Sequence, residues 1–183
     1  RGRIELMKEI VLKGIPAASG ISYGPAFILE RGDFVVPERV ILDHEIDSEI
    51  ARFQEALDFA RRDMMLLKEK ISLDMGLNKA QIFDAHLLVL EDPTLIEQVV
   101  EEIKDLKLCA EYVFSKVMRK YIQTFSKMPD EYLKERAADI NDVTRRVLNF
   151  LMDESRLHEL DNLQNDLVVV AHDLSPSDAV SLY

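Results

Sequence analysis

One stretch of the sequence repeats apolar residues at a fixed spacing. Between residues 46 and 71, eight apolar side chains follow one another at alternating intervals of four and three: Ile46, Ile50, Phe53, Leu57, Ala60, Met64, Leu67 and Ile71. A period of 3.5 residues places all of them on one side of an α-helix, as in helices that pack in bundles. We therefore predict a long helix that begins near Asp43, whose side chain can cap it, and that ends at Gly76.

Further helices are predicted after this one. They cover approximately residues 78–91, 93–106, 110–125 and 130–151. Asp92 and Pro93 mark the clearest boundary, because aspartate is a favoured cap and the first helical turn does not need the N–H group that proline lacks. We expect a bundle of four or five helices.

Short segments of β-type flank the helices. Residues 10–30 hold three of the six glycines and two of the six prolines between apolar runs, which is typical of strands and turns. Residues 35–41 form a second β-like run, in which Pro37 favours an edge strand or an irregular segment. Residues 166–171 contain three consecutive valines, the pattern of a buried strand.

This order predicts an insertion. We expect a mostly α fold with a partial α/β portion, in which a helical bundle (residues 43–155) interrupts an α/β unit formed by residues 1–42 and 156–183. Two or three strands are too few to form an independently stable sheet, so we expect the chain to be a fragment of a larger protein.

Composition limits the class of protein. Hydrophobic residues make up 48% of the 183 residues, which is enough for a globular core. The single cysteine, Cys109, excludes a disulfide framework and a multi-cysteine zinc site. No apolar run approaches the roughly 20 residues of a membrane span, and no signal peptide is recognisable. We therefore expect a cytoplasmic protein that does not insert into a membrane.

The charge of the chain is concentrated. Of the net charge of −11, residues 43–106 carry −9, from 7 basic and 16 acidic side chains. An acidic surface disfavours nucleic acid, whose binding relies on Lys and Arg at phosphates. It is compatible with a basic protein partner, although charge alone favours a helical face that is only solvated.

No motif for metal or nucleotide chemistry is present. The histidines have no i, i+4 metal spacing: His44, His86, His158 and His172. Neither a GxGxxG nor a GxxxxGK[ST] fingerprint occurs. Taken alone, His86 is interpreted as a surface or packing residue of its helix rather than a catalyst. Ser175 begins a helix after a strand, which can hold a phosphoryl group or be an ordinary cap.

Helix 78–91 carries apolar residues on more than one face. Phe83, Leu87 and Leu90 form its main stripe, whereas Ile82 and Leu88, with His86, lie off that stripe. Such residues indicate either a docking patch for a partner or a second buried face. The pattern leaves both readings open.

Four segments together resemble a known family. They read LKGIPAASGISYGPAFIL (residues 12–29), IFDAHLLVLEDPTL (82–95), DEYLKERAADINDVTRRVLNFL (130–151) and VVVAHDLSPSD (168–178). In this order they resemble the N-terminal region of the Enzyme I family, the phosphoenolpyruvate–protein phosphotransferases of the bacterial sugar phosphotransferase system. The likeness extends over residues 8–183.

The resemblance implies a function. Members of the family take a phosphoryl group from phosphoenolpyruvate onto a histidine and pass it to the phosphocarrier protein HPr, and they use Mg²⁺ and form homodimers through a C-terminal domain. It also implies that a helical subdomain docks HPr. At the matching positions, the HPr-docking residues would be Ile82, His86, Leu88 and Arg136.

The resemblance also has limits. Leu77 and Asn78 stand where better-known members carry glutamates, and Ser175 stands where the family often has threonine near the active histidine. That histidine belongs to a GGxTSH-type motif expected beyond residue 183, so His172 is not assigned as the acceptor and the chain alone is expected to be inactive. A non-enzymatic helical-bundle interaction protein and a relative of pyruvate phosphate dikinase are the alternatives.

Overall fold

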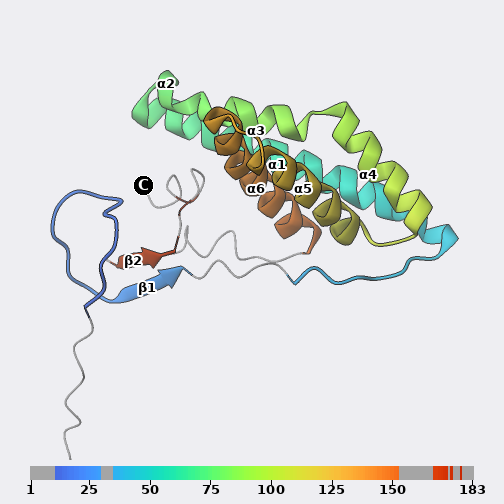
Figure 1. The fold of residues 1–183 in the computed structure, drawn as a ribbon, viewed down its shortest axis with the longest axis horizontal. Coiled ribbons are helices and arrows are strands. Elements are labelled where there is room, and N and C mark those ends of the chain that lie inside the picture. The colour runs from blue at the N-terminus through green and yellow to red at the C-terminus, as the bar shows by residue number, and fades with distance from the viewer. Residues whose placement is uncertain (1–10, 30–34, 153–166, 173, 175–177, 179–183) are drawn as a thin grey trace, which may run out of the picture.

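The computed structural model describes residues 11–29, 35–152, 167–172, 174 and 178. Along the chain these residues form strand β1 (Ala26–Leu29), a short 3-10 helix η1 (Asp43–Glu45), helices α1 (Ile46–Met75), α2 (Leu77–Ala80), α3 (Ile82–Leu90), α4 (Pro93–Leu106), α5 (Ala110–Ser126) and α6 (Glu131–Leu151), and strand β2 (Val168–Ala171). Figure 1 shows the helices gathered together and the two strands side by side outside them. The expected fold class, mostly α with a small α/β portion, is confirmed.

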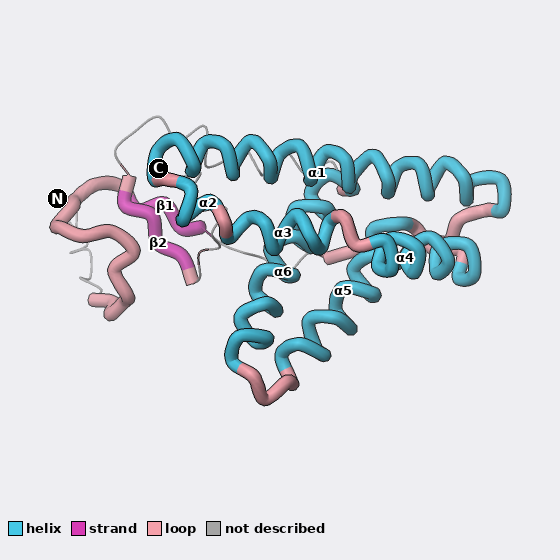
Figure 2. Tube along the Cα trace, turned by 90° about the horizontal axis from the view of Figure 1, so that it is seen from above, coloured by secondary structure: helices cyan, strands magenta, loops and turns pink. Residues whose placement is uncertain are grey.

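Helix α1 is the long helix predicted from the apolar repeat. Phe53, Ala60 and Met64 are 0% exposed, and the ring of Phe53 lies 5.6 Å from the ring of Phe114 on α5. Figure 2 shows α3 and α4 running alongside α1, while α5 and α6 form a hairpin that extends away from it at a steep angle. Because burying one large apolar side chain contributes about 1.5–3 kcal/mol, this repeat supplies much of the stability of the bundle.

The start of α1 differs from the prediction. Residues 43–45 form η1, so Asp43 lies within a 3-10 turn and not at the cap of α1. The side chain of Glu45 turns back instead, and its Oε2 accepts a hydrogen bond of 2.7 Å from the backbone N–H of Leu42. The prediction for Asp43 was wrong because the segment begins with a 3-10 turn, and the Asp43 carboxylate lies 2.6 Å from Lys107 Nζ instead of capping α1.

The predicted boundary between the second and third helices is confirmed. Asp92 Oδ1 accepts a hydrogen bond of 2.9 Å from the backbone N–H of Thr94, and Pro93 is the first residue of α4. The predicted helix 78–91, however, is two helices, α2 and α3, which meet at Gln81. α3 is therefore a separate element that packs against both α1 and α6.

The two strands enclose the helices in sequence. β1 and β2 pair in parallel, with Ala26 opposite Val168 and Leu29 opposite Ala171. The expected insertion of the bundle between two parts of one sheet is confirmed by this pairing. β2 begins at Val168, two residues later than predicted. The domain boundaries at residues 42 and 155 stay predictions, and residue 155 lies outside the described residues.

Residues 35–41 do not form a strand. Among the described residues, the β-type pairing of this segment is a single antiparallel bridge between Val40 and Leu108. Proline lacks the N–H group that a ladder needs, so Pro37 helps to keep the segment irregular. The prediction of a second β-run was therefore wrong, while the irregular alternative holds.

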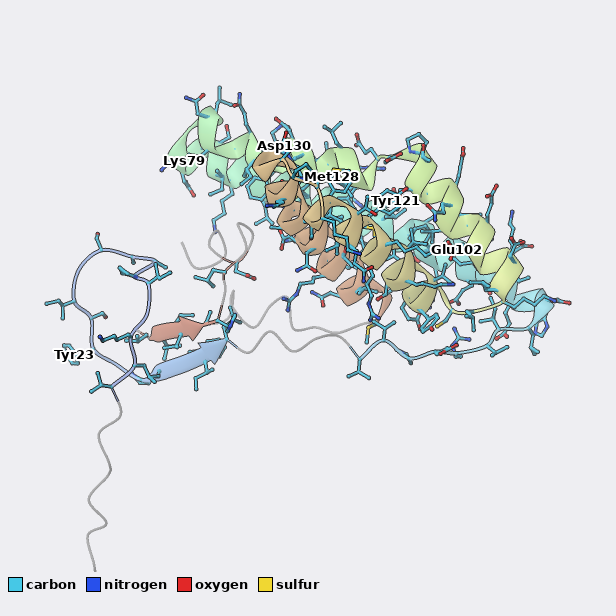
Figure 3. The ribbon with its side chains drawn as sticks, in the orientation of Figure 1. Tyr23, Lys79, Glu102, Tyr121, Met128 and Asp130 are labelled. Atoms are coloured by element: carbon cyan, nitrogen blue, oxygen red, sulfur yellow. The ribbon has the colours of Figure 1, made fainter. Side chains whose placement is uncertain are left out.

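Polar contacts join α4 to α5 on the outside of the bundle. Glu102 accepts hydrogen bonds from Gln98 at 3.1 Å and from Lys120 at 3.3 Å, and the hydroxyl of Tyr121 donates to Gln98 Oε1 at 3.3 Å. Figure 3 shows Glu102 and Tyr121 on these neighbouring helices. These side chains are engaged with one another. Helix α3, in contrast, exposes apolar side chains, so it is the surface considered next for a partner.

Candidate partner-binding surface

Helix α3 is amphipathic in an unusual way. Phe83 and Leu90 are each 1% exposed and anchor the helix in the core. On its outer side, Ile82 is 42% and Leu88 is 70% exposed. Ala85 lies three residues from each of them, which places it between them on the helix surface. An apolar strip therefore faces solvent along a helix whose other side is firmly buried.

His86 lies beneath this strip and not on it. Its side chain is 0% exposed, and its ring lies 5.7 Å from the ring of Phe83. The sequence left open whether these residues form a docking patch or a second buried face. Each alternative holds for some of them: Ile82 and Leu88 are exposed, whereas His86 belongs to the buried face. The expectation that His86 itself contacts a partner disagrees with this structure, because the neighbouring α6 covers it.

The buried imidazole lies beside two carboxylates of α6. Nδ1 of His86 is 3.0 Å from the carbonyl oxygen of Ile82, one turn earlier on α3. Nε2 lies 3.4 Å from Asp142 Oδ2 and 3.9 Å from Asp139 Oδ1, and the second distance is too long for a direct hydrogen bond. The site therefore holds a buried nitrogen aimed at negative charge.

These contacts set the charge of the imidazole. A carbonyl oxygen only accepts, so Nδ1 must carry a hydrogen to bond Ile82. In the neutral ring Nε2 would then direct a lone pair at two carboxylates, which favours the doubly protonated, cationic ring. Burial lowers the pKa of His86, but Asp142, the Ile82 carbonyl and Asp139 outweigh burial and raise the pKa above its ordinary value of 6.5.

Arg136 lies on the outer side of the same carboxylates. Its side chain is 32% exposed, and Nη1 is 2.9 Å from Asp139 Oδ2. Asp139, at 13% side-chain exposure, thus has one oxygen toward Arg136 and the other toward buried His86. We call Ile82, Leu88 and Arg136 the α3–α6 surface.

The acidic rim of this surface is neutralised from α1. Asp84 pairs with Lys68, and Glu91 Oε1 lies 3.2 Å from Arg61 Nε. Both carboxylates are about half exposed, so a basic partner can compete for them. On α2, Leu77 is 74% exposed, so the position lacking the expected glutamate presents an apolar side chain.

Sequence reasoning missed Asp139 and Asp142. Both follow Arg136 at intervals of three residues, on the edge of α6 beside its buried positions Ala137 and Ile140. Charged residues at a spacing of three along an otherwise apolar helix edge were the available signal. Ser175, the other predicted site residue, lies outside the described residues.

The arrangement is suited to binding a partner. In the part of the chain that the structure describes, no group of three or more His, Cys, Asp and Glu side chains is placed to hold a metal ion. Within the same residues, no helix has the length and apolar character needed to span a membrane. An exposed apolar strip with a guanidinium at its edge is typical of a surface that binds another protein.

Comparison with known proteins gives a consistent result. The family described as "PEP-utilising enzyme, N-terminal" matches residues 13–136. The chain is 41% identical over 171 residues to a phosphoenolpyruvate-protein phosphotransferase of Listeria monocytogenes, and 39% identical over 174 residues to the one of Bacillus subtilis. Each alignment covers 93% of this chain but only 29% and 30%, respectively, of the relative.

Solved structures share the fold. An NMR solution structure of Enzyme I (nEIt) matches with a TM-score of 0.72 and 34% identity, over 87% of this chain and 64% of that one. The N-terminal domain of "Enzyme 1 - Nitrogen" matches with a TM-score of 0.66 and 23% identity, over 87% and 64%, which is a likeness of fold alone. The expected resemblance to Enzyme I is thereby confirmed.

Proposed function

Since the chain belongs to the family of PEP-utilising enzymes, as their N-terminal region, we propose that it docks the phosphocarrier HPr in a phosphoenolpyruvate–protein phosphotransferase. The α3–α6 surface is the docking site in this proposal. The chain spans about three-tenths of the length of its curated relatives, so the complete reaction involves residues outside this sequence.

One observation supports this placement most strongly. Ile82 and Leu88 are exposed on a helix whose other side is anchored in the core, and Arg136 of the neighbouring α6 pairs with Asp139, which faces His86 of the same helix. Monomeric proteins rarely keep apolar side chains together in water unless a partner covers them. Docking on a rigid helix also positions the partner accurately, which is the main requirement of phosphoryl transfer between two histidines.

In this proposal the chain contributes position and charge. The phosphoryl group passes from phosphoenolpyruvate to an enzyme histidine and from there to a histidine of HPr, and neither His86 nor exposed His172 is assigned as that enzyme histidine. The bundle's acidic residues attract a basic carrier and speed its encounter. The use of Mg²⁺, the homodimer contacts and the cytoplasmic location of the intact enzyme are part of the same proposal, and they follow from the resemblance to the family.

The relatives favour this function over the two alternatives. The curated proteins reported above are named as phosphotransferases, which argues against an interaction protein without an enzymatic parent. A relationship to pyruvate phosphate dikinase does not account for the exposed helical surface, whereas a docking role explains it directly.

Calorimetry tests the proposal. HPr of Bacillus subtilis, titrated into residues 1–183, should bind with 1:1 stoichiometry and an affinity that falls with salt, because charge guides the encounter. Hen lysozyme, a small basic protein, is the control for non-specific attraction to a chain of net charge −11. Absence of HPr binding, or binding no tighter than that of lysozyme, would contradict the proposed function.

A further inference from the structure

Asp139 connects a buried histidine to an exposed arginine. We propose that His86 is a positioning residue, which fixes Arg136 on the α3–α6 surface through Asp139, so that HPr binds more weakly once His86 loses its proton. This inference rests on the proposed docking function. It replaces direct contact between His86 and the partner, which burial of the ring prevents.

The geometry of Asp139 carries the first step. Oδ2 is 2.9 Å from Arg136 Nη1, and Oδ1 is 3.9 Å from Nε2 of His86. The carboxylate therefore lies between two cations, one in water and one in the core. Arginine has a long side chain that loses considerable rotamer freedom when it is fixed, so a carboxylate held in one place pre-organises the guanidinium.

The environment of His86 carries the second step. Both charged groups found facing the ring come from α6, namely Asp139 and Asp142, and α3 contributes the Ile82 carbonyl. The charged pairs between α3 and α1, Lys68 with Asp84 and Arg61 with Glu91, are partly exposed and separate from these contacts. Protonated His86 attracts both carboxylates, whereas the neutral ring presents a lone pair to them.

Loss of the proton therefore alters the position of Asp139. With a neutral ring, Asp139 and Asp142 lose the attraction of the imidazolium, and Asp139 instead faces the Nε2 lone pair, which repels it. Asp139 then holds Arg136 less firmly. Because ordering one long side chain at an interface is worth a modest fraction of the binding energy, the Kd for HPr should rise about two- to tenfold as His86 deprotonates.

The link can be tested first in the free protein. NMR of residues 1–183 from pH 6 to pH 9 would follow the Cε1 signal of His86 and the Nε signal of Arg136. The two signals should titrate with the same midpoint, and the response of Arg136 should disappear in Asp139→Asn. Asp84→Asn is the matched control, since it removes a carboxylate on the α1 side of α3 and should leave the response unchanged.

Binding provides the second test. The Kd for HPr, measured over the same pH range, should rise with pH in the native chain. This rise should be smaller in His86→Gln, which has no titrating ring, and in Asp139→Asn, which removes the carboxylate that links the ring to Arg136. The comparison removes the contribution of the carrier's own titrating groups. In the Arg136→Ala background, Asp139→Asn should have little further effect. Circular dichroism confirms that each variant is folded.

The outcomes distinguish the two proposals. HPr binding with an identical pH profile in the native chain, in His86→Gln and in Asp139→Asn would overturn the positioning role and leave the docking function intact. Different titration midpoints for His86 and Arg136 would do the same. Failure of the native chain to bind HPr at any pH would overturn the docking function, and with it this inference.

Discussion

Leu88 provides a test of a single residue. It is 70% exposed, so Leu88→Asp removes little packing and should change the free energy of unfolding by less than about 0.5 kcal/mol. If Leu88 is a central contact, the same change should weaken HPr binding by about 1–3 kcal/mol, measured by calorimetry. Arg136→Glu should weaken it to a similar degree.

A matched control makes this result specific. Leu42 is 60% exposed and precedes η1, whereas α3 contacts α1 near Arg61 and Lys68. Leu42→Asp adds the same charge and removes the same side chain away from the α3–α6 surface. It should leave HPr affinity unchanged, and equal losses for Leu42→Asp and Leu88→Asp would remove the surface from the account.

His86 also makes a prediction about stability. Its pKa is raised in the folded state, so above pH 6.5 the folded chain binds more protons at this site than the unfolded chain does. The stabilisation from the charged ring is therefore fully present below pH 6.5 and is lost as the pH rises through the raised pKa. Urea unfolding should show the native chain's advantage over His86→Gln shrinking between pH 6.5 and pH 9. An advantage that grows with pH would mean that the ring is buried as a neutral group.

At the scale of elements, a charged cluster joins α1 to the ends of α5 and α6. Glu49, only 6% exposed, accepts hydrogen bonds from Arg52 at 2.5 Å and from the backbone N–H of Ala110 at 2.7 Å. Arg52 in turn donates to the carbonyl oxygen of Leu151 at 2.6 Å. Burial raises the pKa of Glu49, but the hydrogen bonds from Arg52 and Ala110 outweigh burial and lower it, so the carboxylate is ionised at neutral pH.

Removing Glu49 should therefore weaken the whole bundle. Glu49→Ala leaves the first N–H of α5 without its acceptor and removes one of the carboxylates that pair with Arg52. Together these losses should lower the free energy of unfolding by about 2–3 kcal/mol. Asp58→Ala is the control, because Asp58 forms an exposed pair with Arg61 and should contribute less than about 1 kcal/mol. Urea denaturation that gives equal losses for the two variants would show that the cluster has no special role.

The start of α4 offers a smaller prediction. Asp92→Ala removes the acceptor for the N–H of Thr94, and such caps typically contribute about 1 kcal/mol. Asp92→Asn, which retains an acceptor oxygen, should recover most of the loss in urea denaturation. If Asn and Ala are equally destabilising, the cap hydrogen bond does not contribute and the charge of Asp92 is responsible.

At the scale of the whole molecule, the sequence predicted what periodicity and local chemistry determine. The apolar repeat of α1, the Asp92–Pro93 start of α4 and the bundle between two strands each follow from residues close together in the chain. The outcome for α3 could not be predicted in this way. Whether Ile82 and His86 are exposed depends on where α6 lies beside α3, which is a tertiary contact over more than 50 residues of sequence.

The same reason explains the errors at the site. The spacing of Ile82, His86 and Leu88 allowed a common surface, but α6 covers the middle residue and supplies the carboxylates that charge it. Residues 35–41 failed as a strand because a strand also needs a partner, and among the described residues Val40 forms an isolated bridge to Leu108 instead of a ladder. The resemblance to a family led to the proposed function, which composition and periodicity alone could not indicate.

The most direct test of the docking account is an NMR titration of ¹⁵N-labelled residues 1–183 with unlabelled HPr. The account predicts that the backbone amide signals of α3, and of α6 around Arg136, shift or broaden as HPr is added, with those around Leu88 among the most affected. Signals of the outer face of α4, around Glu97 and Glu101, should stay in place. Changes confined to α4 and α5, with α3 unaffected, would contradict the account.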